Sequence, residues 1–169
     1  MQFHAWDKYT RPLYNMLLRI FYLIVIIASS GGCAKINLYE KSVHIPRQEW
    51  SYSNKPSFAF NVMDTSARYN VYVVVRHTDA YKYNNLWVSL GSQAPGDSML
   101  FQNINLQLAN DKTGWEGIGM DDIYEVRKNI TPGPVPFRKA GTYQFRVGQV
   151  MRENPLKHIL DIGIRVEKL

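Results

Sequence analysis

The sequence predicts an all-β protein: an antiparallel β-sandwich of about seven or eight strands that follows an N-terminal signal helix. Apolar and polar residues alternate in several segments, as they do in strands with one buried face. Groups of Asn, Asp, Pro and Gly, which favour turns, separate these segments. No long segment after the leader has the apolar spacing of a helix. The pattern fits both an immunoglobulin-like and a jelly-roll strand order.

The expected strands follow one another after the leader. Two less regular segments, near residues 38–45 and 49–52, come first. The regular segments cover residues 57–62, 71–76, 86–90, 100–108, 142–147 and 160–167. In the last of them the apolar residues share one face, because side chains in a strand point to alternate sides. These residues are Leu160, Ile162, Ile164 and Val166.

One long part of the chain lacks a strand pattern, residues 111–138. We expect functional loops there, because binding residues are often carried on loops. Its one helical candidate is 121–128, where Asp121 and Asp122 would suit the positive end of a helix.

Residues 1–32 have the features of a secretory signal peptide. Lys8, Arg11 and Arg19 precede an apolar run at 20–28, and small residues follow it. The run has 9 residues, whereas a membrane-spanning helix needs ~20. The leader is therefore expected to be an export signal that is removed.

The single cysteine, Cys33, follows the Ser-Gly-Gly sequence at 30–32, a placement typical of the lipidation site of a bacterial lipoprotein. A covalent lipid such as palmitate would hold the protein on a membrane, because each buried CH₂ contributes ~0.8 kcal/mol. Ser30 occupies a position that usually holds a large aliphatic residue, so an ordinary signal peptide or an uncleaved amphipathic anchor are the alternatives. On this interpretation 33–37 is the lipidated cysteine with a short tether, and 38–169 is the β-sandwich domain.

The charges of the chain do not favour binding to nucleic acid. The net charge is +6, and it is scattered without a run of like charges. We expect no nucleic-acid partner and no small-molecule substrate, and the membrane is expected as a partner through the lipid.

Candidate catalytic and metal-binding groups are few. His44, His77 and His158 lie far apart in the sequence and lack the spacing of metal ligands. His77 and Asp79 would share one side of a strand end, or they would form a turn. Asp122 belongs to an acidic cluster that could hold Ca²⁺, but its spacing matches no EF-hand, so a solvated loop or a helix start is the simpler interpretation. The sequence therefore predicts no enzyme, no metal and no cofactor apart from the lipid on Cys33.

The aromatic residues, 13% of the chain, are better candidates for binding. Exposed Trp and Tyr contact sugars or protein partners well, although the same residues would also fill the core of a sandwich without disulfides. The candidate binding residues are Trp50, His77, Asp79, Trp87, Trp115 and Asp122.

Several strings together resemble the gliding motility lipoprotein family of the GldH type, found in the Bacteroidetes. They are QEWSYS at 48–53, VRHTD at 75–79 with NLW at 85–87, GIG at 117–119 with DIY at 122–124, and MRENPL at 151–156 with ILDIGIR at 159–165. The resemblance implies a non-enzymatic outer-membrane lipoprotein of the gliding machinery, whose components overlap with the type IX secretion apparatus. Cys33 alone carries over with a defined role.

These inferences lead to three functional hypotheses. The first is a structural or interaction protein that supports motility or secretion and binds other proteins of that machinery. Ala34 has no acidic run behind it, which favours an outer-membrane lipoprotein that faces the periplasm. The second is a lectin-like module that uses Trp50, Trp87 or Trp115 to bind carbohydrate. The third is a hydrolase built on His77 and Asp79, which would require these side chains to meet another titratable group in a cleft.

Overall fold

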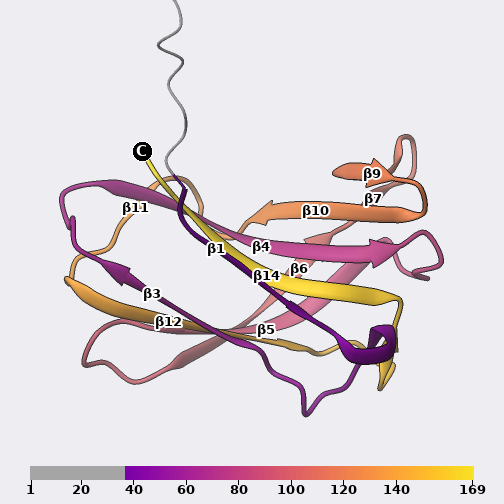
Figure 1. Ribbon diagram of the computed structural model, residues 1–169, viewed down its shortest axis with the longest axis horizontal. Coiled ribbons are helices and arrows are strands. Elements are labelled where there is room, and N and C mark those ends of the chain that lie inside the picture. The colour runs from indigo at the N-terminus through magenta and orange to yellow at the C-terminus, as the bar shows by residue number, and fades with distance from the viewer. Residues whose placement is uncertain (1–36) are drawn as a thin grey trace, which may run out of the picture. The chain divides into compact units, whose positions relative to one another are not determined.

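The computed structural model describes residues 37–169, which form two antiparallel β-sheets packed face to face (Figure 1). Sheet 1 has six strands in the order β1-β14-β4-β10-β9, with β11 also paired to β4. Sheet 2 has four strands in the order β3-β12-β5-β6. The predicted fold class, an all-β antiparallel sandwich, is confirmed.

The strands of sheet 1 are β1 (Asn37–His44), β4 (Arg68–Thr78), β9 (Ile118–Met120), β10 (Ile123–Asn129), β11 (Val135–Pro136) and β14 (Ile159–Lys168). The strands of sheet 2 are β3 (Ser57–Val62), β5 (Asn85–Gln93), β6 (Leu100–Gln107) and β12 (Gly141–Gln149). Short pairs join β2 (Glu49–Trp50) to β13 (Leu156–Lys157) and β7 (Ala109–Asn110) to β8 (Gly114–Trp115). A single 3₁₀ turn, η1 (Pro46–Gln48), precedes β2.

The core forms where the apolar sides of the two sheets meet. Val73 and Ile162 of sheet 1 and Val88 and Val147 of sheet 2 have no exposed surface. Each fully buried side chain of this size stabilises the fold by ~1.5–3 kcal/mol relative to an exposed one. The alternation in the sequence therefore predicts the core because period 2 is the geometry of these strands.

The start of β14 departs from strict alternation. The register shifts between Ile159 and Asp161, so Leu160 lies in a bulge. As a result Ile159 is fully buried, whereas Leu160 is half-buried. The prediction that Leu160 shares the inner face with Ile162 is wrong for this reason, since an extra residue reverses the side to which the preceding residues point.

The predicted helix at 121–128 is also wrong. Most of this segment is β10, which pairs with β4 from Ile123 opposite Thr78 to Asn129 opposite Tyr72. Pairing satisfies the backbone groups of β4 along its length and buries Val126. These tertiary gains outweigh a weak local preference for a first helical turn.

The two ends of the sandwich are distinct. We call the near end the one where Asn37 pairs with Glu167 and the C-terminus also lies, and the far end the one where Thr78 pairs with Ile123 and β5 begins. Figure 1 shows β1 starting beside the C-terminus, with β9 at the opposite end. The chain therefore enters the domain at the near end.

The predicted signal peptide (1–32) and the lipidation site Cys33 lie outside the described residues, and so does most of the tether. Within residues 37–169, no helix has the length and apolar character needed to cross a bilayer.

Candidate functional site

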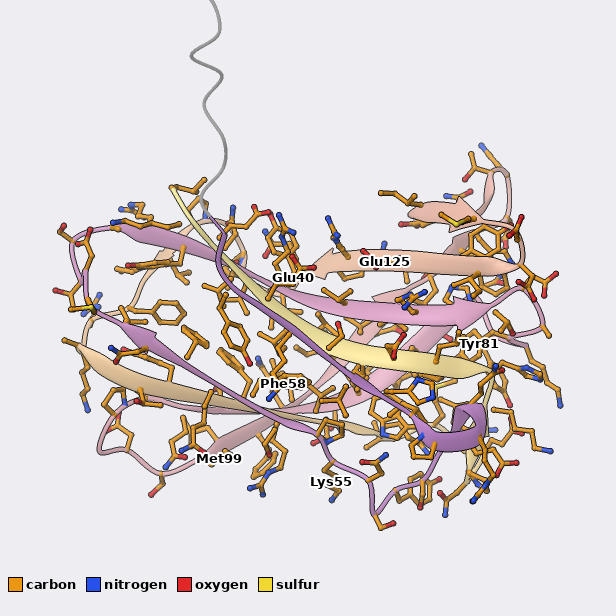
Figure 2. The ribbon with its side chains drawn as sticks, in the orientation of Figure 1. Glu40, Lys55, Phe58, Tyr81, Met99 and Glu125 are labelled. Atoms are coloured by element: carbon orange, nitrogen blue, oxygen red, sulfur yellow. The ribbon has the colours of Figure 1, made fainter. Side chains whose placement is uncertain are left out.

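The outer face of sheet 1 is covered by charged side chains that pair with one another. Arg165 has only 13% of its side chain exposed and contacts Glu40 at 2.5 Å and Glu167 at 2.7 Å. Burial lowers the pKa of Arg165, but its hydrogen bonds to Glu167 and Glu40 outweigh burial and raise it, so it stays charged. Figure 2 labels Glu40 and Glu125, which reach this network from β1 and β10. The paired residues are Glu40, His44, Arg76, Glu125, Arg127, Asp161, Arg165 and Glu167.

The outer face of sheet 2 carries mainly amides and hydroxyls. The cross-strand pairs fix which side chains lie together, because directly opposite residues point to the same side. The outward residues of β5, β6 and β12 are Asn85, Trp87, Ser89, Gln93, Phe101, Asn103, Asn105, Gln107, Thr142, Gln144 and Arg146. This face therefore offers hydrogen-bonding groups and aromatic rings instead of ion pairs.

Two neighbouring hollows mark the far end of this face, and we call them together the outer groove. The larger, about 590 Å³, is lined by Tyr83, Asn85, Trp87, Asn103, Val150, Met151 and Arg152. The smaller, about 360 Å³, is lined by Tyr52, Lys55, Ser89, Gly148, Gln149, Val150 and Met151. Val150 and Met151 belong to both, so the hollows adjoin. These volumes lie in the range of small-molecule sites.

Trp87 is positioned by the alternation of β5. Its neighbours Leu86 and Val88 are fully buried, so Trp87 must point outward, and it is 42% exposed. Its backbone oxygen accepts a hydrogen bond from the N–H of Val150 at 3.0 Å. Beside it, the Asn85 amide donates to Oδ1 of Asn105 at 2.8 Å. The indole N–H makes no hydrogen bond to another described residue.

The wall of the groove is the segment after β12, and Gln149 holds it. The buried Gln149 amide donates to the backbone oxygens of Trp50 and Glu153 at 3.2 and 3.1 Å. Its Oε1 accepts from the backbone N–H of Met151 at 2.8 Å. The Tyr52 hydroxyl adds a hydrogen bond to the Met151 oxygen at 2.6 Å. The segment is therefore fixed from two sides.

The charged side chains that line the groove are both positive. Neither the Arg152 guanidinium nor the Lys55 ammonium has a carboxylate partner among residues 37–169. The nearby Glu153 is engaged with the Tyr83 hydroxyl at 3.2 Å, a hydrogen bond that raises the pKa of Tyr83. The groove therefore attracts anions.

His77 lies in the core at the far end and forms no catalytic pair with Asp79. Its Nδ1 donates to the Thr78 carbonyl at 2.8 Å, so the neutral ring leaves Nε2 as an acceptor, and Nε2 is buried without a partner among the described residues. Burial lowers the pKa of His77. Asp79 is exposed in a turn, where its N–H donates to the Asp122 oxygen at 2.8 Å.

The remaining candidates are placed in three different environments. Trp50 is fully buried, and its indole donates to the Asn54 oxygen at 2.7 Å. Trp115 is half-buried, with its ring 4.5 Å from that of His77. Asp122 is exposed. Of the six candidate binding residues, Trp87 alone lines the outer groove.

Several groove residues were missed by reasoning from the sequence. Lys55, Asn103 and Arg152 come from separate loops and strands, and no local pattern distinguishes them. Trp87 did carry a signal, because it occupies a position of the alternation that other strands fill with polar residues.

Two of the acidic residues near β10 are paired with cations. Within residues 37–169, no group of three or more His, Cys, Asp or Glu side chains is arranged to hold a metal ion. Glu116 pairs with Lys128, and Glu125 pairs with Arg127 at 2.8 Å.

The described chain is thus a β-sandwich whose distinguishing features lie on its outer surfaces, and comparison with known proteins places it among the bacterial lipoproteins. The chain belongs to the GldH lipoprotein family, whose model matches residues 37–166. The resemblance seen in the sequence is confirmed, and with it a gliding-motility lipoprotein that associates with a membrane.

Two relatives agree with this assignment. The gliding motility lipoprotein GldH homolog of Christiangramia forsetii is 27% identical over 158 residues, covering 88% of this chain and 94% of the relative. The gliding motility lipoprotein GldH of Flavobacterium johnsoniae is 28% identical over 126 residues, covering 70% and 77%.

Solved structures show only distant likenesses. Dimeric latent PorU from Porphyromonas gingivalis gives a TM-score of 0.32 at 9% identity, covering 82% of this chain and 13% of that chain. The infectious bursal disease virus Gx strain structure gives 0.31 at 9% identity, covering 79% and 32%. Neither likeness bears on function.

Proposed function

We propose that the protein is a lipid-anchored interaction component of the gliding machinery, linked to type IX secretion, that faces the periplasm from the outer membrane. Membership of the GldH lipoprotein family supports the motility role. The observation that carries the interaction role is an exposed apolar edge strand, β9, at the far end of sheet 1.

The anchor would hold the near end at the membrane. Cys33 precedes Asn37 by four residues, and an extended chain spans at most ~3.6 Å per residue, or about 14 Å in all. With a lipid on Cys33, the near end of the sandwich lies close to the bilayer. The far end then points away from it, toward other envelope proteins.

The edge strand β9 is suited to pairing with a partner strand. Ile118 and Met120 are 71% and 75% exposed, and they line a hollow of about 250 Å³. Its other lining residues are Arg76, Asp121, Asp122, Ile123 and Glu125. Natural edge strands usually carry charges or bulges that prevent pairing. The outward residues of β9 carry no charge, so a partner strand can add to sheet 1 there and contact Ile118 and Met120.

The test is recovery of partners from the native envelope with the tagged, full-length protein. Cys33→Ala removes the lipid site, and Met120→Lys places a charge on the edge strand. Met63→Lys is the matched control, because Met63 is 85% exposed in the turn after β3 at the near end. We expect motility or secretion proteins to be recovered with the wild type and with Met63→Lys, and to be lost with the other two variants. Equal recovery with all four proteins would contradict the proposal.

A further inference from the structure

We infer that the outer groove of sheet 2 binds a carboxylate-bearing sugar chain. A sugar ring stacks on Trp87, and Arg152 and Lys55 hold its carboxylates. This binding site is separate from the edge strand β9, so the inference does not depend on the proposed protein interaction.

The shape of the groove suits a chain of sugars better than a single ring. The two hollows, about 590 and 360 Å³, share Val150 and Met151 and so form one extended depression. Trp87 and Arg152 line its larger part, whereas Lys55 lines its smaller part. One ligand that contacts all three must therefore span both hollows.

Trp87 supplies the apolar contact that sugar rings require. The C–H groups on one face of a pyranose ring pack on an aromatic face, and indole adds an N–H donor at its edge. Trp87 is 42% exposed and its N–H is free of described partners. Asn85 and Asn103 line the same hollow, and amide groups both donate to and accept from hydroxyls.

The charges select an acidic sugar. No acidic side chain lines either hollow, and the two cations present, Arg152 and Lys55, are without carboxylate partners in the described part of the chain. A guanidinium binds a carboxylate through two parallel hydrogen bonds. On sheet 1, by contrast, arginines of comparable position are already neutralised.

The backbone around the groove argues against a peptide ligand. The floor lies mainly on β5 and β12, and Asn103 adds the edge strand β6. At Trp87, β5 pairs with β6 on one side and accepts the Val150 N–H on the other, so recognition there comes from side chains. The wall is held by Gln149 and Tyr52, which reduces the entropy that binding must remove.

The experiment is isothermal titration of the full-length protein in detergent. The ligands are hexagalacturonate and its methyl ester, which has the same rings with the carboxylates masked. At low salt we expect saturable binding of hexagalacturonate and weaker binding of its methyl ester. Added salt should lower the affinity for hexagalacturonate.

Variants separate the two contacts. Trp87→Ala should weaken binding of both sugars about tenfold or more, and Trp87→Phe should recover part of that loss. Arg152→Gln should weaken the acid about fivefold and leave the ester within about twofold. Phe101→Ala and Arg138→Gln are the matched controls, an exposed aromatic of the same face outside the groove and an exposed arginine away from it. Both should bind as the wild type does.

Three outcomes would overturn the inference. The first is the absence of saturable binding to the acid by a folded protein. The second is that the wild type binds the acid and the ester with equal affinity, and that Arg152→Gln does so too. The third is an equal loss on Phe101→Ala, which would indicate a non-specific apolar contact.

Discussion

The outer faces of the two sheets differ in how their polar side chains are paired. Both consist of every second residue of strands whose other residues form the core. On sheet 1 these residues are acids and bases that neutralise one another, as in the Arg165 contacts with Glu40 and Glu167. On sheet 2 they are amides, hydroxyls and aromatic rings, and the cations at the groove lack acidic partners among the described residues. A face that satisfies its own charges stabilises the fold, whereas one that does not is available to a ligand.

The largest effect is expected from breaking the network on sheet 1. Arg165→Met should lower the free energy of unfolding by about 2–3 kcal/mol, because it removes the cation that contacts the buried Glu167 at 2.7 Å and one of the two cations paired with Glu40. Arg146→Met is the control on sheet 2, where the side chain is exposed and has only Ser57 as a described partner, so it should change stability by less than about 0.5 kcal/mol. Urea unfolding measures both. Similar losses from the two variants would remove the distinction between the faces.

Two glycines, one on each sheet, allow the packing of the two outer faces to be compared by adding a methyl group. A Cβ on Gly163 would lie 2.3 Å from the Ser42 Oγ and 2.8 Å from the backbone oxygen of Lys41, so β1 would have to move. Gly163→Ala should therefore cost about 1–3 kcal/mol.

Gly148 is the matched position on sheet 2. A Cβ there would meet the flexible Lys55 side chain at 3.1 Å, which can move away. Gly148→Ala should cost less than about 0.5 kcal/mol, while narrowing the smaller hollow. Urea unfolding of both variants is the measurement, and a Gly148→Ala loss as large as that of Gly163→Ala would show that both faces resist an added methyl group equally.

The wall of the groove gives a smaller effect with a functional readout. Gln149→Ala leaves the Met151 N–H and two backbone oxygens without their partner, so stability should fall by about 1–2 kcal/mol. Protection of the 150–154 amides from hydrogen exchange should fall with it. Unchanged protection would show that the other hydrogen bonds, from Tyr52 to Met151 and from Val150 to Trp87, hold the wall without Gln149.

The smallest effect on stability is expected from His77, which lies in the core and on neither outer face. An unfolded histidine has a pKa of about 6.5, and burial lowers the pKa of His77 in the folded state. Below about pH 6.5 the unfolded chain therefore takes up a proton that the folded protein excludes, and stability falls as the pH decreases. At about pH 8 His77 is neutral in both the folded and the unfolded state, so its protonation does not change the stability there.

His77→Phe should flatten this dependence. We expect the variant to lose less stability than the wild type between about pH 8 and pH 5.5, measured by urea unfolding at each pH. The rings of Tyr81, Tyr124 and Trp115 surround that of His77. Equal losses of stability in the wild type and in His77→Phe would mean that other groups cause the loss of stability at low pH.

The sequence predicts the strands better than it predicts the site. Alternation locates the long strands because a half-buried strand requires it, as 57–62 and 142–147 show. It fails at Leu160, where a bulge inserts a residue, and in β10, whose pairing depends on the distant strand β4. Neither event has a local cause that can be read from neighbouring residues.

The groove is harder still, because it joins residues from distant parts of the chain. Lys55 precedes β3, Tyr83 and Trp87 surround the start of β5, and Arg152 follows β12. The outward position of Trp87 is predictable from β5 alone. Whether Arg152 meets a carboxylate depends on the packing of segments that lie far from it along the chain, so its lack of an acidic partner among the described residues is visible only in the folded structure.

The antiparallel pairing of β1 with β14 has a mechanical consequence. A pull on the chain before Asn37 enters the domain along β1, whose residues from Asn37 to His44 face those from Glu167 to Asp161. When the domain is held at its far end, such a force acts parallel to the strands. It loads the inter-strand hydrogen bonds together, in shear, instead of opening them one at a time. The ion pairs of Glu40 cross the same boundary, so β1 is the strand best placed to bear tension applied at its start.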